Sequence, residues 1–261
     1  MRLFKYVKPE RVDILSNLEI AFTPPDALND PFELTPAVKM DRAAVRREMK
    51  KYGPEFLARR PELDKLRRRK RKEAYQQWRD QTAKPQLRKP AESFQDFIPD
   101  NLGSRFGILC LSTTHDNLLM WSHYTDSHRG FVIEFDSTEP AFVELGPQFP
   151  INYSDERPVY DESKRNDIAA WQTKGLIWKY EGEYRVFRFL EDCRRVRKHT
   201  GDGDVFLVPF QPPCLRAVYL GCRTPTECEQ QILEIAKKHS LRVLKGRPHR
   251  TSYALNFVPL N

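Results

Sequence analysis

The sequence Trp178-Lys-Tyr-Glu181-Gly-Glu183-Tyr-Arg185 places two carboxylates two positions apart in a pattern typical of a β-strand. Alternate residues of a strand lie on the same face, so we expect Glu181 and Glu183 to point the same way, about 7 Å apart. Like charges on one strand face repel each other, so the presence of this pair requires a physical explanation. Either the face is solvated and matched by neighbouring Lys and Arg side chains, or it forms a carboxylate site in which Glu183 reacts.

The segments on either side of this stretch predict an α+β fold. Each predicted strand is short and bounded by Gly, Pro or polar residues. Strands are expected at residues 3–7, 20–22, 105–111, 131–135, 215–220, 241–244 and 253–257. Helices are expected at residues 9–15, 117–124, 164–174 and 224–238. Because strands and helices do not alternate regularly, mixed small β-sheets with flanking helices are favoured over a doubly wound parallel sheet.

Length and composition favour one decorated globular domain over residues 1–261. A hydrophobic content of 39% argues against wholesale disorder. No apolar run approaches the roughly 18 residues that span a bilayer, so no membrane contact is expected. The first residues, Met1 to Tyr6, are strand-like and lack the apolar stretch of a signal peptide. They predict a cytoplasmic protein.

Cysteine and histidine spacing gives no sign of a metal site. The five cysteines form no CxxC pair, and their odd number predicts free thiols in a reducing compartment. His123 and His128 are five positions apart and lack an HExxH frame. We therefore expect no structural metal.

The positive charge is concentrated in one segment. The chain has a net charge of +8, but residues 41–90 contain 18 Lys or Arg against 7 Asp or Glu, a net charge of +11. Prolines bracket two predicted helices there, at about residues 38–52 and 62–83. The segment therefore reads as a basic helical insertion at residues 41–90.

The centre of the insertion is a candidate nucleic-acid-binding surface. Its basic residues are Arg67, Arg68, Arg69, Lys70, Arg71 and Lys72, and the aromatic residues Tyr75 and Trp78 follow. Lys and Arg side chains bind phosphates, and aromatic rings stack on bases. Charge runs are also common on solvated helix faces, so binding of RNA or DNA and a solvated insertion both remain open.

Several motifs together resemble a bacterial and phage family known as domain of unknown function 2971. They are Leu3-Phe4-Lys5-Tyr6, Asn29-Asp30-Pro31-Phe32-Glu33, Met120-Trp121-Ser-His123-Tyr124 with Gly130-Phe131, Trp178-x-x-Glu181-x-Glu183-x-Arg185, and Val218-Tyr-Leu-Gly221. The resemblance covers both ends of the chain and is weakest over residues 41–90. It implies no activity by itself.

The order of these motifs is also similar to that of ADP-ribosyltransferases, which hold NAD in a cleft between two small β-sheets. This resemblance implies a split β-sandwich and NAD as a substrate. Glu183 would match the catalytic glutamate, Glu181 the residue that orients the acceptor, and Ser112 the motif serine. Lys5 stands where arginine or histidine is usual. Its ammonium group is a point charge and cannot form the bidentate contact of a guanidinium group.

The same resemblance implies a set of NAD-binding residues: Lys5, Tyr6, Ser112, Trp121, His123 and Tyr124. Trp121 and Tyr124 lie three positions apart on one predicted helical face, where they either line the cleft or pack in the core. His123 either binds a phosphate or satisfies a buried carbonyl group, and we favour the second role.

Three functions remain open from the sequence. The first is an NAD-consuming transferase or glycohydrolase, such as a toxin or phage-defence effector, which modifies nucleic acid or protein and is restrained by an antitoxin or regulatory partner. The second is a nucleic-acid-binding module without catalysis. The third is a metal-dependent nuclease that uses Asp30, Glu33, Glu181 and Glu183.

Overall fold

A computed structural model gives the fold, and it describes residues 1–34, 37–38, 69–70, 72–74, 76–77, 105–160, 169–197 and 204–261. The chain divides into two compact units. The first comprises Met1–Leu34, Asn101–Glu156 and Trp171–Asn261, and the second comprises Thr35–Asp100 and Arg157–Ala170. Mixed sheets and few helices confirm the α+β class. The predicted 41–90 insertion lies within the second unit, mostly outside the described residues.

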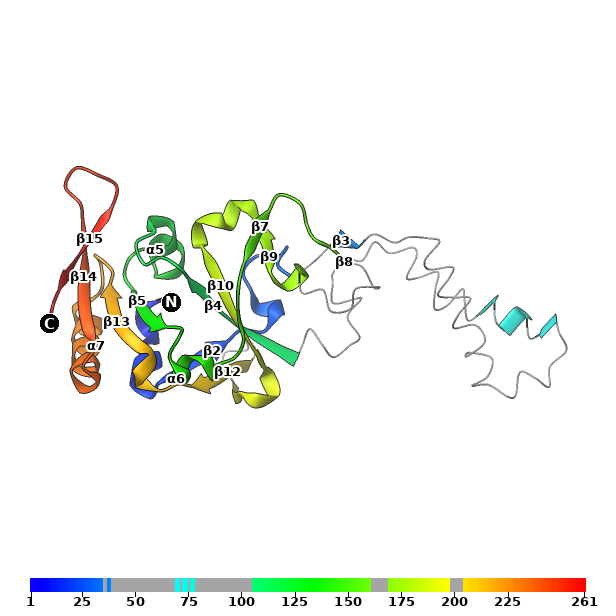
Figure 1. Ribbon diagram of the computed structural model, residues 1–261, viewed down its shortest axis with the longest axis horizontal. Coiled ribbons are helices and arrows are strands. Elements are labelled where there is room, and N and C mark those ends of the chain that lie inside the picture. Colours follow the sequence, from blue (N-terminus) through cyan, green and yellow to red (C-terminus); the bar gives the residue numbers. More distant parts are fainter. Residues whose placement is uncertain are drawn as a thin grey trace. The chain divides into compact units, whose positions relative to one another are not determined.

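An eight-stranded sheet dominates the first unit (Figure 1). In sheet order its strands are β15 (Leu255–Pro259), β14 (Arg242–Pro248), β13 (Leu215–Leu220), β5 (Phe131–Asp136), β1 (Arg2–Val7), β4 (Phe106–Ser112), β10 (Glu183–Phe189) and β6 (Gln148–Pro150). β13 and β14 run parallel and are joined by α7 (Thr226–His239), whereas the other neighbours in this sheet are antiparallel. A parallel pair needs such a crossover because a tight hairpin cannot join it.

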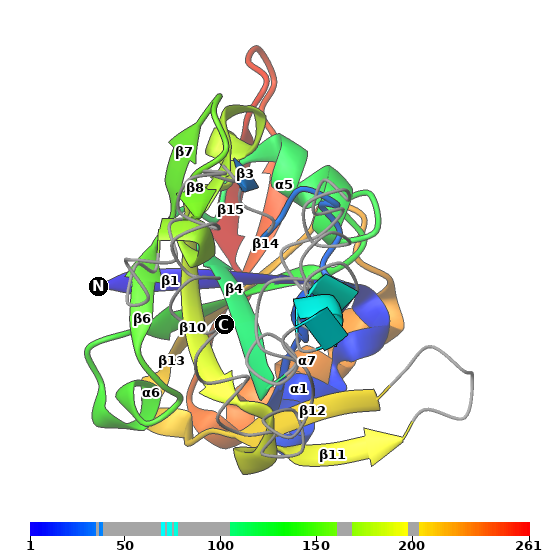
Figure 2. The ribbon, with the colours of Figure 1, turned by 90° about the vertical axis from the view of Figure 1, so that its right-hand side faces the viewer.

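The described residues form three further sheets, two in the first unit and one in the second, and Figure 2 labels some of their strands. Their strands are β11 (Arg194–Arg197), β12 (Asp204–Pro209) and β2 (Glu19–Phe22) in the first; β7 (Asn152–Ser154) and β9 (Thr173–Gly175) in the second; and β3 (Ala37–Val38) and β8 (Val159–Tyr160) in the third. A bridge between Thr23 and Ile108 ties the end of β2 to β4. β4 therefore links the large sheet to the three-stranded one.

Apart from α7, the helices whose bounds the structure describes are short. They are α1 (Asp13–Asn17), α5 (Leu118–Tyr124) and α6 (Pro140–Val143), with 3-10 turns η1 (Pro9–Arg11), η2 (Pro25–Ala27), η7 (Ala169–Trp171), η8 (Leu176–Glu181), η9 (Leu190–Asp192) and η10 (Pro212–Cys214). α5 begins as expected after Asn117, whose side chain accepts hydrogen bonds from the backbone N–H groups of Leu119 and Met120. This N-cap fixes where the helix starts.

Both faces of the large sheet are packed. Adjacent residues of a strand point to opposite faces, so Leu3 and Phe4 of β1 enter different apolar clusters. One cluster includes side chains of α1 and α7, and the other includes Met120 and Trp121 of α5. The candidate site lies on the α5 side, where β10 and β4 carry their polar residues.

Some predicted elements differ from the structure. Residues 164–174 were expected to be helical, but Ala169–Trp171 is a 3-10 turn and Lys174 lies in strand β9. Residues 161–168 lie outside the described part. In the basic segment, residues 69–70, 72–74 and 76–77 are helical as expected, whereas Val38 belongs to strand β3 and not to a helix.

Two further properties concern the environment of the chain. In the part that the structure describes, no helix is long and apolar enough to cross a membrane. All five cysteines are described, and they are free thiols as predicted.

His115 gives the fold a testable pH dependence. Its ring lies 5.2 Å from Phe4, 4.3 Å from Tyr219 and 5.1 Å from Phe257, measured between ring centroids. Burial lowers the pKa of His115 against an opposing effect of Asp116, so the folded protein binds fewer protons than the unfolded chain just below pH ~6.5. The free energy of unfolding therefore decreases as the pH falls through this range, because protonation of His115 favours the unfolded chain. His115→Phe, which keeps an aromatic ring, should lose less Tm than the wild type between pH ~7.5 and ~5.5. An equal loss in both proteins would contradict this assignment.

Candidate functional site

The two glutamates meet through a turn and not along a strand. Glu181 is the last residue of η8, and Glu183 is the first residue of β10, so the expectation that both lie in one strand is wrong. Gly182 between them adopts a left-handed conformation with φ 50° and ψ 48°. A Cβ atom at this position would clash with Thr113 Oγ1. Glycine is therefore required both for the backbone angle and for the close approach of the chain just after β4.

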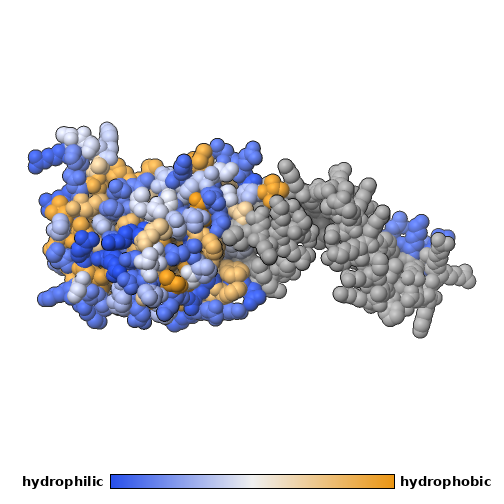
Figure 3. Space-filling view, in the orientation of Figure 1, coloured by the Kyte–Doolittle hydropathy of each residue, from blue (hydrophilic) through white to orange (hydrophobic). Residues whose placement is uncertain are grey.

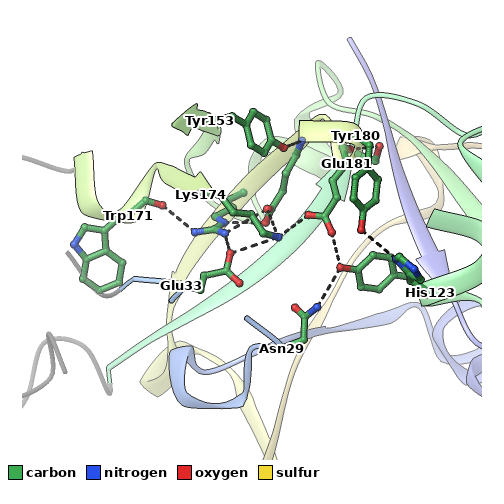
Figure 4. Close-up of polar contacts among 12 residues, drawn as sticks. Asn29, Glu33, His123, Tyr153, Trp171, Lys174, Tyr180 and Glu181 are labelled. Atoms are coloured by element: carbon green, nitrogen blue, oxygen red, sulfur yellow. Dashed lines mark hydrogen bonds and ion pairs between the residues drawn. The ribbon is translucent and has the colours of Figure 1, made fainter. Parts of the chain in front are cut away.

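The ammonium group of Lys174 joins the carboxylates. Its Nζ donates to Glu181 Oε2 at 2.5 Å and to Glu183 Oε2 at 3.1 Å, and it lies 3.6 Å from Glu33 Oε1 (Figure 4). The Lys174 side chain is only 4% exposed. Burial alone would lower its pKa, but Glu183 and Glu181 together raise it. Lys174 is therefore held as a cation at the centre of three carboxylates.

Arg185 supplies the second buried cation. Its Nε donates to Glu183 Oε1 at 2.8 Å, one terminal nitrogen also pairs with Glu33, and the other donates to the carbonyl of Trp171 at 3.1 Å. Arg185 is fully buried, and Glu181 and Glu183 are 3% and 4% exposed. The alternative of a solvated strand face is therefore wrong.

The cluster has an excess of negative charge. Among the described residues, Glu33, Glu181 and Glu183 face Lys174 and Arg185, which gives three formal negative charges against two positive ones. Two further groups, Asp30 acting on Arg185 and Lys5 acting on Glu183, add one charge of each sign. Burial raises the pKa of Glu183, and Lys174 opposes this shift. The polar interior is thus held together by paired charges with one carboxylate in excess.

A chain of hydrogen bonds connects the cluster to the surface. Tyr124 OH donates to Glu181 Oε1 at 2.5 Å, and exposed Asn29 donates to the same hydroxyl at 3.2 Å. Burial, together with Glu181, raises the pKa of Tyr124. Exposed His123 shares a hydrogen bond of 3.1 Å with Tyr180 OH beside it. Glu181 is therefore linked to the exposed Asn29 through a single tyrosine hydroxyl.

Ser112 lies beside the pair of glutamates. It is directly opposite Glu183 in the pairing of β4 with β10, and opposite Phe4 in the pairing of β4 with β1. Its hydroxyl donates to the backbone carbonyl of Glu181 at 2.6 Å and accepts from the N–H of Thr114 at 3.1 Å. Ser112 thus fixes the turn that carries Glu181.

The remaining residues predicted to bind NAD occupy different environments. Lys5 Nζ donates to the carbonyl of Cys110 at 3.0 Å, and burial lowers the pKa of Lys5. Tyr6 OH donates to the carbonyl of Thr114 at 3.1 Å. Trp121 is fully buried, and its indole N–H donates to the carbonyl of His115 at 2.7 Å, so this ring is part of the core.

His123 does not have its favoured role. It is exposed and contacts a tyrosine hydroxyl, so the expectation that it satisfies a buried carbonyl group is wrong. In the basic segment, Arg69, Lys70 and Lys72 are exposed, and Arg69 pairs with Glu73 at 3.0 Å. Arg67, Arg68 and Arg71 lie outside the described residues.

Sequence reasoning missed two members of the site. Lys174 was placed in a predicted helix, and nothing in its local pattern connects it with Glu181. Tyr153 OH accepts a hydrogen bond of 2.7 Å from the backbone N–H of Glu183, and burial raises the pKa of Tyr153 to about 12. By contrast, the polar turn Asn29–Glu33 is one of the motifs found in the sequence. This turn supplies Asn29 and Glu33 to the site. Within the described ranges, no group of three or more His, Cys, Asp or Glu could hold a metal ion.

Gly182 and Gly175 flank η8 and allow a matched test of the turn. A left-handed backbone conformation costs an alanine about 1–2 kcal/mol. Gly182→Ala should destabilise the protein by more than this, because the new Cβ also clashes with Thr113. Gly175 has φ −58°, and the nearest atom to its added Cβ is 3.7 Å away, so Gly175→Ala should change stability little. Urea unfolding of both variants measures the difference, and equal effects would show that the turn is not constrained.

Comparison with known proteins adds one finding on family. Among curated proteins and among solved structures, no significant match is found. Residues 120–186 match the model of a family described as protein of unknown function (DUF2971). The matched region includes Tyr124, Lys174, Glu181, Glu183 and Arg185, so the buried charge cluster falls largely within it. Residues 120–186 are therefore similar to this family, as the motifs at Met120–Phe131 and Trp178–Arg185 predicted, whereas the other motifs lie outside the matched residues.

Proposed function

We propose that this protein is an NAD-consuming enzyme that transfers ADP-ribose to an acceptor or to water. The observation that supports the proposal is the buried cluster with one excess carboxylate, of which Glu181 is joined through Tyr124 to exposed Asn29. Cleavage of the bond between nicotinamide and ribose develops positive charge on the ribose. A fixed negative group in a site of low dielectric stabilises such a charge.

The proposed reaction balances without a metal or a redox partner. The C–N bond between nicotinamide and ribose breaks, and nicotinamide leaves with the electron pair as a neutral molecule. A new bond forms between the ribose carbon and an oxygen or nitrogen of the acceptor, which loses a proton. With water as the acceptor, the products are nicotinamide, ADP-ribose and one proton.

The cluster offers a role for each glutamate. Glu183 is held by Lys174 and Arg185, so it is a fixed charge beside the reacting ribose. Glu181 is linked through Tyr124 to the exposed Asn29, and it accepts the proton of the acceptor by way of Tyr124. Ser112 and Lys174 are positioning residues, because they contact the glutamates rather than the substrate in this scheme. The nicotinamide ring would lie against Tyr124 and Tyr180, on the solvent side of Glu181.

The same geometry offers less to a metal-dependent nuclease. That function needs Asp30, Glu33, Glu181 and Glu183 to share a divalent cation. The ammonium of Lys174 already lies between the oxygens of three of these residues. A metal ion at this position would have to displace it.

Nicotinamide release from NAD tests the proposed reaction directly. Purified full-length protein is assayed with and without RNA, DNA and cell extract. Glu183→Gln should lower the rate by about 100-fold or more, as removal of a charge-stabilising group does. Tyr124→Phe, which removes one hydroxyl that donates to Glu181, should lower it by about 10-fold.

The control is Glu191→Gln, which makes the same chemical change in an exposed side chain paired with Arg105. It should leave the rate unchanged. Glu183→Gln also disturbs a buried ion pair, so Tm is measured for every variant, and Tyr124→Phe provides a test in which no charge is removed. Wild-type protein that releases no nicotinamide under any condition, or release that survives Glu183→Gln, would overturn the proposal.

The exposed basic side chains at Arg69, Lys70 and Lys72 favour a second function, the binding of RNA or DNA. Lys70→Glu with Lys72→Glu should weaken binding to an oligonucleotide. The dependence of log K on log salt concentration should also flatten by about 0.7–0.9 for each phosphate that is no longer neutralised. Lys237→Glu with Lys238→Glu on α7 makes the same change in charge elsewhere and should have a smaller effect. Equal effects of the two double variants would show that only net charge matters.

A further inference from the structure

The last two strands of the chain form a ribbon that extends beyond the rest of the large sheet. β14 and β15 pair in antiparallel register from Leu244 opposite Pro259 to Pro248 opposite Leu255. The loop between them projects past the sheet in both ribbon views (Figures 1 and 2). β15 is also the end strand of the sheet, so its outer edge carries no neighbouring strand among the described residues. The ribbon is therefore open to a partner on several sides.

The ribbon carries only positive charge, and all of it lies on β14 and the turn that follows. Residues 240–261 contain four Lys or Arg and no Asp or Glu. Lys245 is paired with Glu229 at 2.6 Å. Arg242, Arg247 and Arg250 are exposed, and within the described part of the chain they form no ion pair. Outside residues 41–90 the chain as a whole is slightly acidic, so this positive surface is a local feature.

The tip of the ribbon is an ordered turn that carries an exposed aromatic ring. His249 Nδ1 accepts hydrogen bonds from the backbone N–H groups of Thr251 and Ser252, at 3.2 and 3.1 Å. The N–H of His249 donates to the carbonyl of Ala254 at 2.9 Å and closes the turn. Tyr253 follows with a relative exposure of 101%. The turn thus holds a solvent-exposed ring close in sequence to Arg250.

We propose that the β14–β15 ribbon binds single-stranded nucleic acid, with Arg247 and Arg250 on phosphates and Tyr253 stacked on a base. Guanidinium groups pair with phosphate oxygens, and an exposed ring stacks on any unpaired base. Because the turn is already ordered, little conformational entropy is lost on binding. A membrane surface fits less well. Besides Tyr253, the tip offers Arg, His, Thr and Ser, and the projection at the upper left of Figure 3 is coloured blue to nearly white, without an apolar face to insert.

This surface is separate from the basic segment around Lys70 and does not depend on the NAD chemistry. Binding is therefore measured without NAD, on the full-length protein. Fluorescence anisotropy with labelled single-stranded RNA and DNA of about 12 nucleotides gives the affinity. A duplex of the same length and vesicles containing anionic lipid are tested in parallel, at salt concentrations between about 50 and 200 mM.

Tyr253→Ala should weaken binding of the single strands by about 5- to 100-fold and affect the duplex less. Arg247→Ser with Arg250→Ser should weaken binding and flatten its salt dependence by about 0.7 for each phosphate that is no longer neutralised. The control, Lys237→Ser with Lys238→Ser, removes the same charge near the start of β14 and should change affinity less. All three variants alter exposed residues, so their Tm should match the wild type.

Several outcomes would overturn the ribbon proposal. One is single-strand binding that survives both ribbon variants unchanged, even if it is abolished in the Lys70 and Lys72 variant. Another is an equal loss of affinity in the ribbon and control variants, which would show that only the net charge of the protein matters. Wild-type binding to anionic vesicles without binding to any oligonucleotide would assign the ribbon to membranes instead. Because nicotinamide release is not measured here, none of these outcomes depends on the proposed enzymatic function.

Discussion

The contact of the Lys174 ammonium with Glu181 and Glu183 is the interaction on which the site depends. These two carboxylates, with Glu33, would repel one another strongly in a buried position. Lys174 and Arg185 remove that repulsion, and removing one partner of a buried pair typically costs about 3–5 kcal/mol. The cluster is therefore a single unit, in which removal of either cation would leave buried carboxylates unpaired.

This unit connects parts of the chain that are far apart in sequence. Glu33 comes from the N-terminal turn, Lys174 from β9, Glu181 from the end of η8, and Glu183 with Arg185 from β10. A network of this kind contributes little net stability compared with apolar packing, because desolvation of the charges is expensive. Lys174, Glu181, Glu183 and Arg185 lie near the C-terminal end of the matched residues 120–186, and buried, perturbed charges of this kind mark a candidate functional site.

The two basic surfaces stand in contrast to this acidic interior. One lies in the segment around Lys70, and the other is the β14–β15 ribbon, in which Arg247, Arg250 and Tyr253 are exposed. An enzyme that transfers ADP-ribose needs an acceptor, and positively charged surfaces raise the local concentration of a nucleic acid. The proposals are nevertheless independent, because binding and catalysis are measured with different variants.

Much of the fold follows from local pattern. The strands at residues 3–7, 131–135 and 215–220 are apolar on both faces, because both faces of the sheet are covered, and their positions were predictable for that reason. The helix after Asn117 was equally predictable from its capping residue. The predictions were wrong at residues 164–174, where a 3-10 turn and the short strand β9 replace the predicted helix, and at Glu181, which ends a 3-10 turn and does not lie in a strand. Such turns are set by tertiary contacts and have weak sequence signals.

The sequence by itself placed Glu181 and Glu183 two positions apart beside Arg185, and it left open whether they form a site or a solvated face. It also determined that Gly182 lies between them, but not what that glycine does. Only the tertiary structure decided that the glutamates meet across a left-handed turn, with Lys174 between them and Tyr124 leading to solvent. The physical reason is that a buried charge is satisfied by whichever partner the fold brings near, and the position of that partner in the sequence is not fixed by local pattern.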